Sequence, residues 1–108
     1  MEYSVVLERK AEIDINEAFV GIAELAPDAG IRWFRQVADA MQSLSNMPKR
    51  CVVAPETDKL GFELRQLVFG KHSGRYRIVF RVFDDLAEVR IVAVRHGARK
   101  PLEPADIE

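Results

Sequence analysis

The segment 74–83, GRYRIVFRVF, carries three arginines within a short and otherwise apolar stretch. Arg75, Arg77 and Arg81 share one parity, and alternate side chains of a β-strand lie on the same face. The planar guanidinium group can bind two oxygens of a carboxylate or a phosphate at once. The spacing therefore predicts either a surface for an acidic or polyanionic partner or an ordinary solvated strand face.

The charges of the chain are unevenly distributed along its length. The formal net charge is −1, but residues 65–100 contain nine Lys and Arg residues against three acidic ones. Residues 1–64 contain seven basic and eleven acidic residues, and residues 101–108 contain three acidic residues and no basic one. A basic block inside a mildly acidic chain is expected to complement a polyanionic or acidic partner.

Two amphipathic helices are predicted in the first half of the chain. Between Ala11 and Ala26, apolar residues recur at spacings of three and four residues, which is the period of one helix face. A second apolar stripe runs from Trp33 to Met47. Pro27 separates the two stripes and suits the first position of the second helix. So short a connection predicts an antiparallel helical hairpin.

Strand candidates lie on both sides of this hairpin and are rich in β-branched and aromatic residues. The candidates are residues 3–8, 63–70, 75–83 and 86–96. Residues 71–74 and 84–85 are short enough to form hairpin turns, so the last three strands are expected to form an antiparallel meander. Residues 48–62 are predicted to be a loop with a brief extended piece at 51–54.

The predicted fold is α+β: an N-terminal strand, an antiparallel two-helix hairpin and a three-stranded antiparallel meander, with the helices packed on one sheet face. Alternate residues of such a sheet face core and solvent. One parity of segment 75–83 is therefore expected to face the helices, namely Tyr76, Ile78, Phe80 and Val82. The other parity, Arg75, Arg77, Val79 and Arg81, is expected on an open face. In segment 86–96, one parity holds Arg90, Val92, Val94 and His96, which are expected to share a face.

Length and composition are those of a single folded domain. The 108 residues are 48% hydrophobic and 31% charged, which disfavours a disordered chain. The apolar runs are too short for a membrane span, and no secretory signal is visible. Cys51 is the single cysteine, so neither a disulfide nor a cysteine-based zinc site is expected. We expect a cytoplasmic protein with one domain over residues 1–102, a short acidic tail over 103–108, and no metal or nucleotide cofactor.

The order of the elements, together with three sequence motifs, resembles the RelE/ParE superfamily of bacterial toxins. ELRQLVFGKHSGRYRIVFRV (63–82) is similar to the family pattern of an LR strand, a turn and an arginine-flanked tyrosine strand. VRIVAVRHGARKP (89–101) is similar to the last strand of the family and its His-Gly-Ala-Arg close, and residues 11–48 fit the helical hairpin. The resemblance covers almost the whole chain, from Tyr3 to about Lys100.

This resemblance implies the toxin of a type II toxin–antitoxin system of the plasmid stabilisation type, held inactive by a cognate antitoxin. Such antitoxins usually have a DNA-binding part and a segment that folds onto the toxin, so no direct DNA binding is expected from the toxin alone. ParE-like members act on DNA gyrase, whereas RelE-like members cut messenger RNA inside the ribosome. A shared fold cannot decide between these activities, or between them and a non-toxic interaction module.

The ribonuclease alternative would require a base for the 2′-hydroxyl, cations for the phosphorane and an acid for the leaving oxygen. By the resemblance, Arg65 matches an arginine of the RelE-like LR strand, and Arg81 or Arg77 could match another. His96 could transfer the proton, since its ordinary pKa of ~6.5 is close to working pH. Each also has another interpretation. Arg65 could pair with an acidic side chain or a backbone carbonyl, and Arg77 and Arg81 could be ordinary exposed strand residues or contacts for an acidic antitoxin. By the resemblance, His96 recurs in the family pattern irrespective of activity.

Three departures from the RelE-like pattern favour the ParE-like subgroup, which is not known to hydrolyse RNA. The region between helices and sheet lacks a lysine-rich stretch, and the chain as a whole is not basic, whereas RNA binding draws on a large phosphate-directed electrostatic term. The tail EPADIE is acidic and carries no tyrosine. We therefore expect a protein target such as DNA gyrase. The arginines expected to contact the antitoxin are Arg75, Arg77, Arg81, Arg90 and Arg95.

Overall fold

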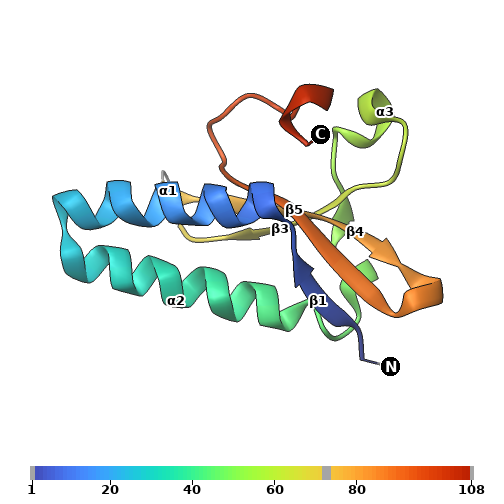
Figure 1. The fold of residues 1–108 in the computed structure, drawn as a ribbon, viewed down its shortest axis with the longest axis horizontal. Helices are drawn as coiled ribbons and strands as arrows, with labels where there is room; N and C mark the ends of the chain where they lie inside the picture. The colour runs from blue at the N-terminus through green and yellow to red at the C-terminus, as the bar shows by residue number, and fades with distance from the viewer. Residues whose placement is uncertain (1, 72–73, 108) are drawn as a thin grey trace.

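The computed structural model describes residues 2–71 and 74–107 (Figure 1). Residues 72 and 73 of the predicted turn over 71–74 lie outside the described residues, as does residue 108 of the tail. The strands are β1 (Ser4–Leu7), β2 (Val52–Val53), β3 (Arg65–Phe69), β4 (Tyr76–Phe83) and β5 (Glu88–His96). The helices are α1 (Arg9–Leu25), α2 (Pro27–Ser43) and the single-turn α3 (Thr57–Leu60). Short 3₁₀ turns lie at Pro48–Arg50, Asp84–Leu86 and Pro104–Asp106.

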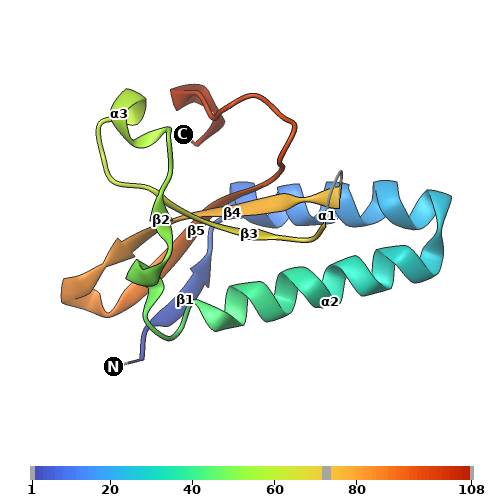
Figure 2. The ribbon, with the colours of Figure 1, turned by 180° about the vertical axis from the view of Figure 1, so that it is seen from behind.

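The five strands form one sheet in the order β1-β5-β4-β3-β2. The meander of β3, β4 and β5 is antiparallel, as predicted, and β2 adds a short antiparallel pairing to β3. β1 runs parallel to β5, so the sheet is mixed rather than purely antiparallel. The α+β fold predicted from the sequence is therefore confirmed, although its sheet is mixed. Figure 2 shows the hairpin from behind, with α2 below α1.

The helical hairpin is confirmed, with Pro27 at the first position of α2. A Cβ built on Gly30 would lie 2.8 Å from the Cβ of Ala23, so the glycine allows α1 and α2 to approach closely. The second helix is shorter than predicted, because the chain leaves α2 to hydrogen-bond the N-terminus: the Tyr3 N–H donates to the Ser45 carbonyl at 2.8 Å. Met47 is consequently 73% exposed rather than part of the apolar stripe. Within the described residues, no helix is long and apolar enough to cross a membrane.

The main core lies between the hairpin and one face of the sheet. Trp33 of α2 belongs to this core, and its ring centroid lies 5.2 Å from that of Tyr76 and 6.3 Å from that of Phe69. The buried members from both layers are Ala11, Ile15, Trp33, Val37, Leu44, Cys51, Ile78, Phe80, Val89, Ile91 and Val94. This confirms that the apolar parity of β4 faces the helices.

The second sheet face is not open, contrary to the prediction. Residues 54–64, which include α3, and the C-terminal segment both pack on it, and they lie side by side in Figures 1 and 2. Their apolar cluster consists of Ala54, Leu64, Val79, Val92, Ala93 and Leu102, all buried. The single turn of α3 explains why the loop prediction for 48–62 is only partly right: the brief strand is present as β2, but a helical turn closed by Gly61 at φ 80° follows it.

A β-bulge corrects the parity prediction for the last strand. Val79 pairs with Ala93 and the next residue, Phe80, pairs with Ile91, so Val92 is an extra residue on β5. A bulge of this kind shifts all later side chains to the other face. Arg90 and Val92 therefore lie on the second face, whereas Val94 and His96 lie on the face covered by the helices.

Candidate binding site

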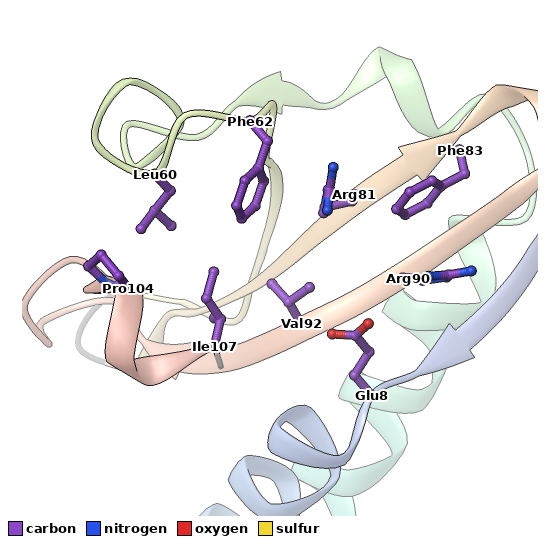
Figure 3. A pocket seen from close by; sticks show the side chains of 9 residues that line it. All are labelled: Glu8, Leu60, Phe62, Arg81, Phe83, Arg90, Val92, Pro104 and Ile107. Carbon is purple, nitrogen blue, oxygen red and sulfur yellow. The ribbon is translucent and has the colours of Figure 1, made fainter.

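A pocket of about 350 Å³ opens on the second sheet face, where β4 and β5 meet the two segments that cover this face. Its floor is formed by Arg81, Arg90 and Val92, which come from the two central strands (Figure 3). Its remaining walls are Glu8, Leu60, Phe62, Phe83, Pro104 and Ile107. Arg81 and Arg90 are register partners across β4 and β5, so the sheet itself places the two guanidinium groups next to each other.

Aromatic rings hold both arginines in place. The Cζ atom of Arg81 lies 4.2 Å from the ring centroid of Phe62 and 4.8 Å from that of Phe83. The Cζ atom of Arg90 lies 4.5 Å from the Phe83 centroid. A cation over an aromatic face within about 6 Å is attracted to the ring. Figure 3 shows Arg81 between the two phenylalanines. This packing fixes where the guanidinium groups stand before any partner arrives.

The two arginines differ in their charge partners. Arg90 donates from Nε to the Glu88 carboxylate, which neutralises it within its own strand. Among residues 2–71 and 74–107, no carboxylate lies within ion-pair distance of the Arg81 guanidinium. Within the described residues, the pocket therefore presents one cation without an ion-pair partner, Arg81, beside an apolar wall.

A buried ion pair holds the two covering segments against the sheet. Glu56 is 2% exposed and accepts hydrogen bonds from both terminal nitrogens of Arg77, at 3.0 Å in one case. Its second oxygen also accepts the Leu102 N–H at 2.9 Å. Gln66 accepts a further hydrogen bond from Arg77 at 2.9 Å. Glu56 therefore links the α3 segment, the sheet and the C-terminal segment, which together carry the pocket walls.

The pKa of Glu56 reflects these contacts. Burial alone would raise the pKa, but the hydrogen bonds from Arg77 and from the Leu102 N–H outweigh it and lower the pKa from 4.5 to about 2. The carboxylate is therefore ionised over the whole physiological range.

We predict a matching pH dependence of stability. Because the folded pKa is depressed, the contribution of Glu56 is complete above 4.5 and is lost as the pH falls through about 2. The shift from 4.5 to about 2 corresponds to about 3 kcal/mol. Urea unfolding across this acid range should show the loss in the natural protein, and the loss should be much smaller in Glu56→Gln. Parallel pH profiles for the two proteins would contradict the assignment.

The other arginines expected at a partner surface have different surroundings. Arg77 is occupied by Glu56, and Arg95 is only 5% exposed. Arg95 donates to the Lys100 carbonyl at 3.2 Å and lies 4.0 Å from Asp106, and burial lowers its pKa. Arg75 is exposed, before β4 begins. The structure thus brings Arg81 and Arg90 together in one pocket. The expectation that Arg75, Arg77 and Arg81 share an open face is wrong, because two segments cover that face and Arg77 is held there by its ion pair with Glu56.

Arg65 lies on the helix side of the sheet, since its register partner on β4 is Phe80. Its Nη1 donates to the carbonyls of Cys51 at 2.7 Å and Lys49 at 3.1 Å, and its Nε contacts Glu63 at 3.1 Å. These bonds fasten the segment before β2 to β3. The surroundings of Arg65 agree with its structural interpretation.

His96 lies at the far end of the same face, in a second pocket of about 270 Å³ with Asp14, Glu17, Tyr76 and Arg99 among its lining residues. Its ring contacts Tyr76 edge to face, with centroids 5.1 Å apart. Its Nδ1 accepts the Ala98 N–H at 3.0 Å. Burial raises the pKa of Tyr76.

The structure does not bring Arg65, Arg81 and His96 together. The β4 partners of Arg65 and His96 are Phe80 and Tyr76, four residues apart, which is about 13 Å along a strand. Arg81 lies on the opposite sheet face. Side chains so arranged cannot contact one scissile phosphate together. Their catalytic roles remain a prediction without a shared site.

Several residues of the pocket were not expected from the sequence. Phe83 shares the parity of Arg81 and could have been found from that spacing alone. Three other pocket residues belong to segments outside the meander, and no periodic pattern links them to Arg81: Phe62, Pro104 and Ile107. Glu56 looked like one charge of a mixed loop, and only the structure shows that it is buried.

Comparison with known proteins supplies a family and a fold. The family model described as the ParE toxin of the type II toxin–antitoxin system parDE matches residues 5–101. No curated protein sequence matches the chain significantly.

Two solved structures are similar in fold. A free arginine double mutant of the Escherichia coli toxin RelE has a TM-score of 0.57 at 14% identity, covering 91% of this chain and 86% of that chain. A chain of the toxin–antitoxin complex RelBE2 from Mycobacterium tuberculosis has a TM-score of 0.50 at 24% identity, covering 89% of this chain and 99% of that chain.

Proposed function

The chain belongs to the ParE family of type II toxin–antitoxin toxins, and from this premise we propose that it acts by binding a protein target, DNA gyrase. A cognate antitoxin neutralises it. The family match carries this proposal, because it spans residues 5–101 and therefore nearly the whole fold. The RelBE2 neighbour is a toxin–antitoxin complex, which supports an antitoxin partner for a chain of this fold.

The geometry of the arginines supports a binding role over RNA cleavage. The guanidinium groups of Arg65 and Arg77 donate hydrogen bonds to acceptors within the chain. Arg81 and His96 lie on opposite faces of the sheet. A ribosome-dependent endoribonuclease would need a base, an acid and cations around one phosphate. The residues expected to catalyse RNA cleavage are thus far apart in the fold, whereas Arg81 and Arg90 lie together in a pocket that suits a protein partner.

The antitoxin is proposed to occupy the part of the second sheet face that the two covering segments leave accessible, namely the pocket around Arg81 and Arg90. Two arginines of the basic block of residues 65–100, Arg81 and Arg90, line this pocket. Complementary charge would speed association with an acidic antitoxin segment and fix its register. Under this proposal the protein acts in the cytoplasm, where both gyrase and the antitoxin are present.

Two assays with the purified chain test the proposed target. In a supercoiling assay with purified DNA gyrase, we expect concentration-dependent inhibition that is removed when the cognate antitoxin is added. In a parallel assay with ribosomes programmed with messenger RNA, we expect intact transcripts. Heat-denatured chain serves as the control in both assays. Ribosome-dependent cleavage with unaffected gyrase would overturn the proposal and favour the RelE-like alternative.

A further inference from the structure

We propose that the pocket around Arg81 binds a peptide segment carrying one carboxylate side chain and one apolar side chain, and that the segment belongs to the antitoxin. This inference rests on the proposed function for the identity of the partner and names the chemistry by which the partner is recognised. It concerns the occupant of a single pocket, which has a charged side and an apolar side.

The carboxylate is assigned to Arg81 because of how that guanidinium group is held. The rings of Phe62 and Phe83 lie 4.2 and 4.8 Å from its Cζ atom, and a stacked guanidinium group keeps its N–H donors free in its own plane. Those donors can bind both oxygens of a carboxylate at once. Arg81 has no ion-pair partner among the described residues, whereas Arg90 is occupied by Glu88. The aromatic packing has already fixed the guanidinium group, so little side-chain freedom is lost on binding.

The apolar side chain is assigned to the other side of the same pocket. In Figure 3, Leu60, Pro104 and Ile107 lie at the side away from Arg90 and Phe83, with Val92 between the two sides. An apolar side chain placed there would bury surface against all four residues. Positions i and i+2 of an extended segment project to the same side, so an acidic residue followed two positions later by an apolar residue fits the pocket.

A nucleic acid is a poorer occupant of this pocket. Bases would stack on aromatic faces, but one guanidinium group already lies 4.2 Å from the Phe62 ring centroid and two lie 4.8 and 4.5 Å from that of Phe83. Glu8 borders the pocket on the side of Val92 and Arg90, and its negative charge would repel a run of phosphates. The apolar wall offers a phosphate backbone no donors. A single carboxylate can bind at Arg81 while avoiding Glu8, and a polyanion cannot.

The test uses short synthetic peptides and the intact chain, observed by nuclear magnetic resonance. The probe is acetyl-Glu-Ala-Leu-amide, compared with acetyl-Gln-Ala-Leu-amide, acetyl-Glu-Ala-Ser-amide and oligouridylate. We expect the first peptide to shift the Arg81 Nε–Hε resonance and the Val92 and Ile107 amide resonances in a saturable way. The Gln peptide, which lacks the carboxylate, should bind about tenfold more weakly. The Ser peptide, which lacks the apolar side chain, should also bind more weakly than the first peptide.

Substitutions in the chain locate the binding. Arg81→Gln should lower the affinity for acetyl-Glu-Ala-Leu-amide by about tenfold. The affinity of Arg81→Lys should lie between those of the natural chain and Arg81→Gln, because lysine keeps the charge but loses the planar fork. Arg32→Gln is the matched control, since it makes the same change at an exposed arginine of α2, outside the pocket, and it should leave the affinity unchanged.

Three results would each overturn the inference: equal affinity for the Glu and Gln peptides, unchanged affinity in Arg81→Gln, or oligouridylate binding at these resonances in place of the peptide. The titration contains no gyrase, so it fails or succeeds independently of the supercoiling assay. A peptide-binding chain that leaves gyrase unaffected would retain the pocket and lose only the proposed target.

Discussion

Replacing Glu56 with Gln is expected to lower the free energy of unfolding by about 3–5 kcal/mol, which is the usual cost of removing one partner of a buried ion pair. The substitution keeps the size of the side chain but leaves the charge of Arg77 without its carboxylate, and the Arg77 side chain is only 11% exposed. Urea unfolding followed by the fluorescence of Trp33, the single tryptophan of the chain, measures the loss.

Glu103→Gln provides the matched control for this experiment. It makes the same chemical change in the Lys59–Glu103 ion pair, where both side chains are 55% exposed, and exposed pairs contribute at most about 1 kcal/mol. The double variant Glu56→Gln/Arg77→Met removes both buried charges and should be more stable than Glu56→Gln alone. If Glu56→Gln and Glu103→Gln had equal effects, the proposed role of Glu56 as the buried link would be wrong.

The ion pair also shows what sequence periodicity can and cannot predict. The helical hairpin and the meander follow from local apolar spacing, and both were predicted correctly because each pattern lies within one continuous segment. Glu56 and Arg77 are 21 residues apart, and neither position differs in its local pattern from a solvated charge. Long-range pairing of this kind leaves no periodic signal, so Arg77 is expected from its sequence to be exposed although its side chain is mostly covered.

The bulge in β5 limited the prediction of faces in a different way. A period-two pattern assigns faces correctly only while the strand stays in register. The extra residue, Val92, is apolar like its neighbours, so the sequence does not mark where the register shifts. Arg90 was placed with His96 for this reason, although the structure puts them on opposite faces.

The candidate pocket was predictable in part. The resemblance and the charge pattern identified Arg81 and Arg90 among the five arginines, but the features that make them a site come from elsewhere. Phe62 follows α3, and Ile107 belongs to the segment 103–108 that was expected to be a short acidic tail. Three separate segments therefore build the pocket around a cross-strand pair, and their convergence depends on the second layer of the fold.

That second layer depends on Leu102, and Leu102→Ala is expected to cost about 2–5 kcal/mol. The side chain is fully buried in the cluster with Leu64, Val79 and Ala93, so truncation would leave a cavity beneath the C-terminal segment. Leu86→Ala is the matched control: Leu86 is 60% exposed, and surface substitutions usually change stability by less than about 0.5 kcal/mol. Urea unfolding of both variants at neutral pH gives the comparison.

A double-mutant cycle connects this prediction to the first. The Leu102 N–H donates to Glu56 at 2.9 Å, so loosening the C-terminal segment should also weaken the environment that keeps Glu56 ionised. Residues that share a network typically couple by about 0.5–3 kcal/mol, and we expect the effects of Leu102→Ala and Glu56→Gln to be less than additive. Strict additivity, or an effect of Leu102→Ala as small as that of Leu86→Ala, would show that the C-terminal segment does not belong to the folded unit. The pocket wall formed by Pro104 and Ile107 would then not be held in place for a partner.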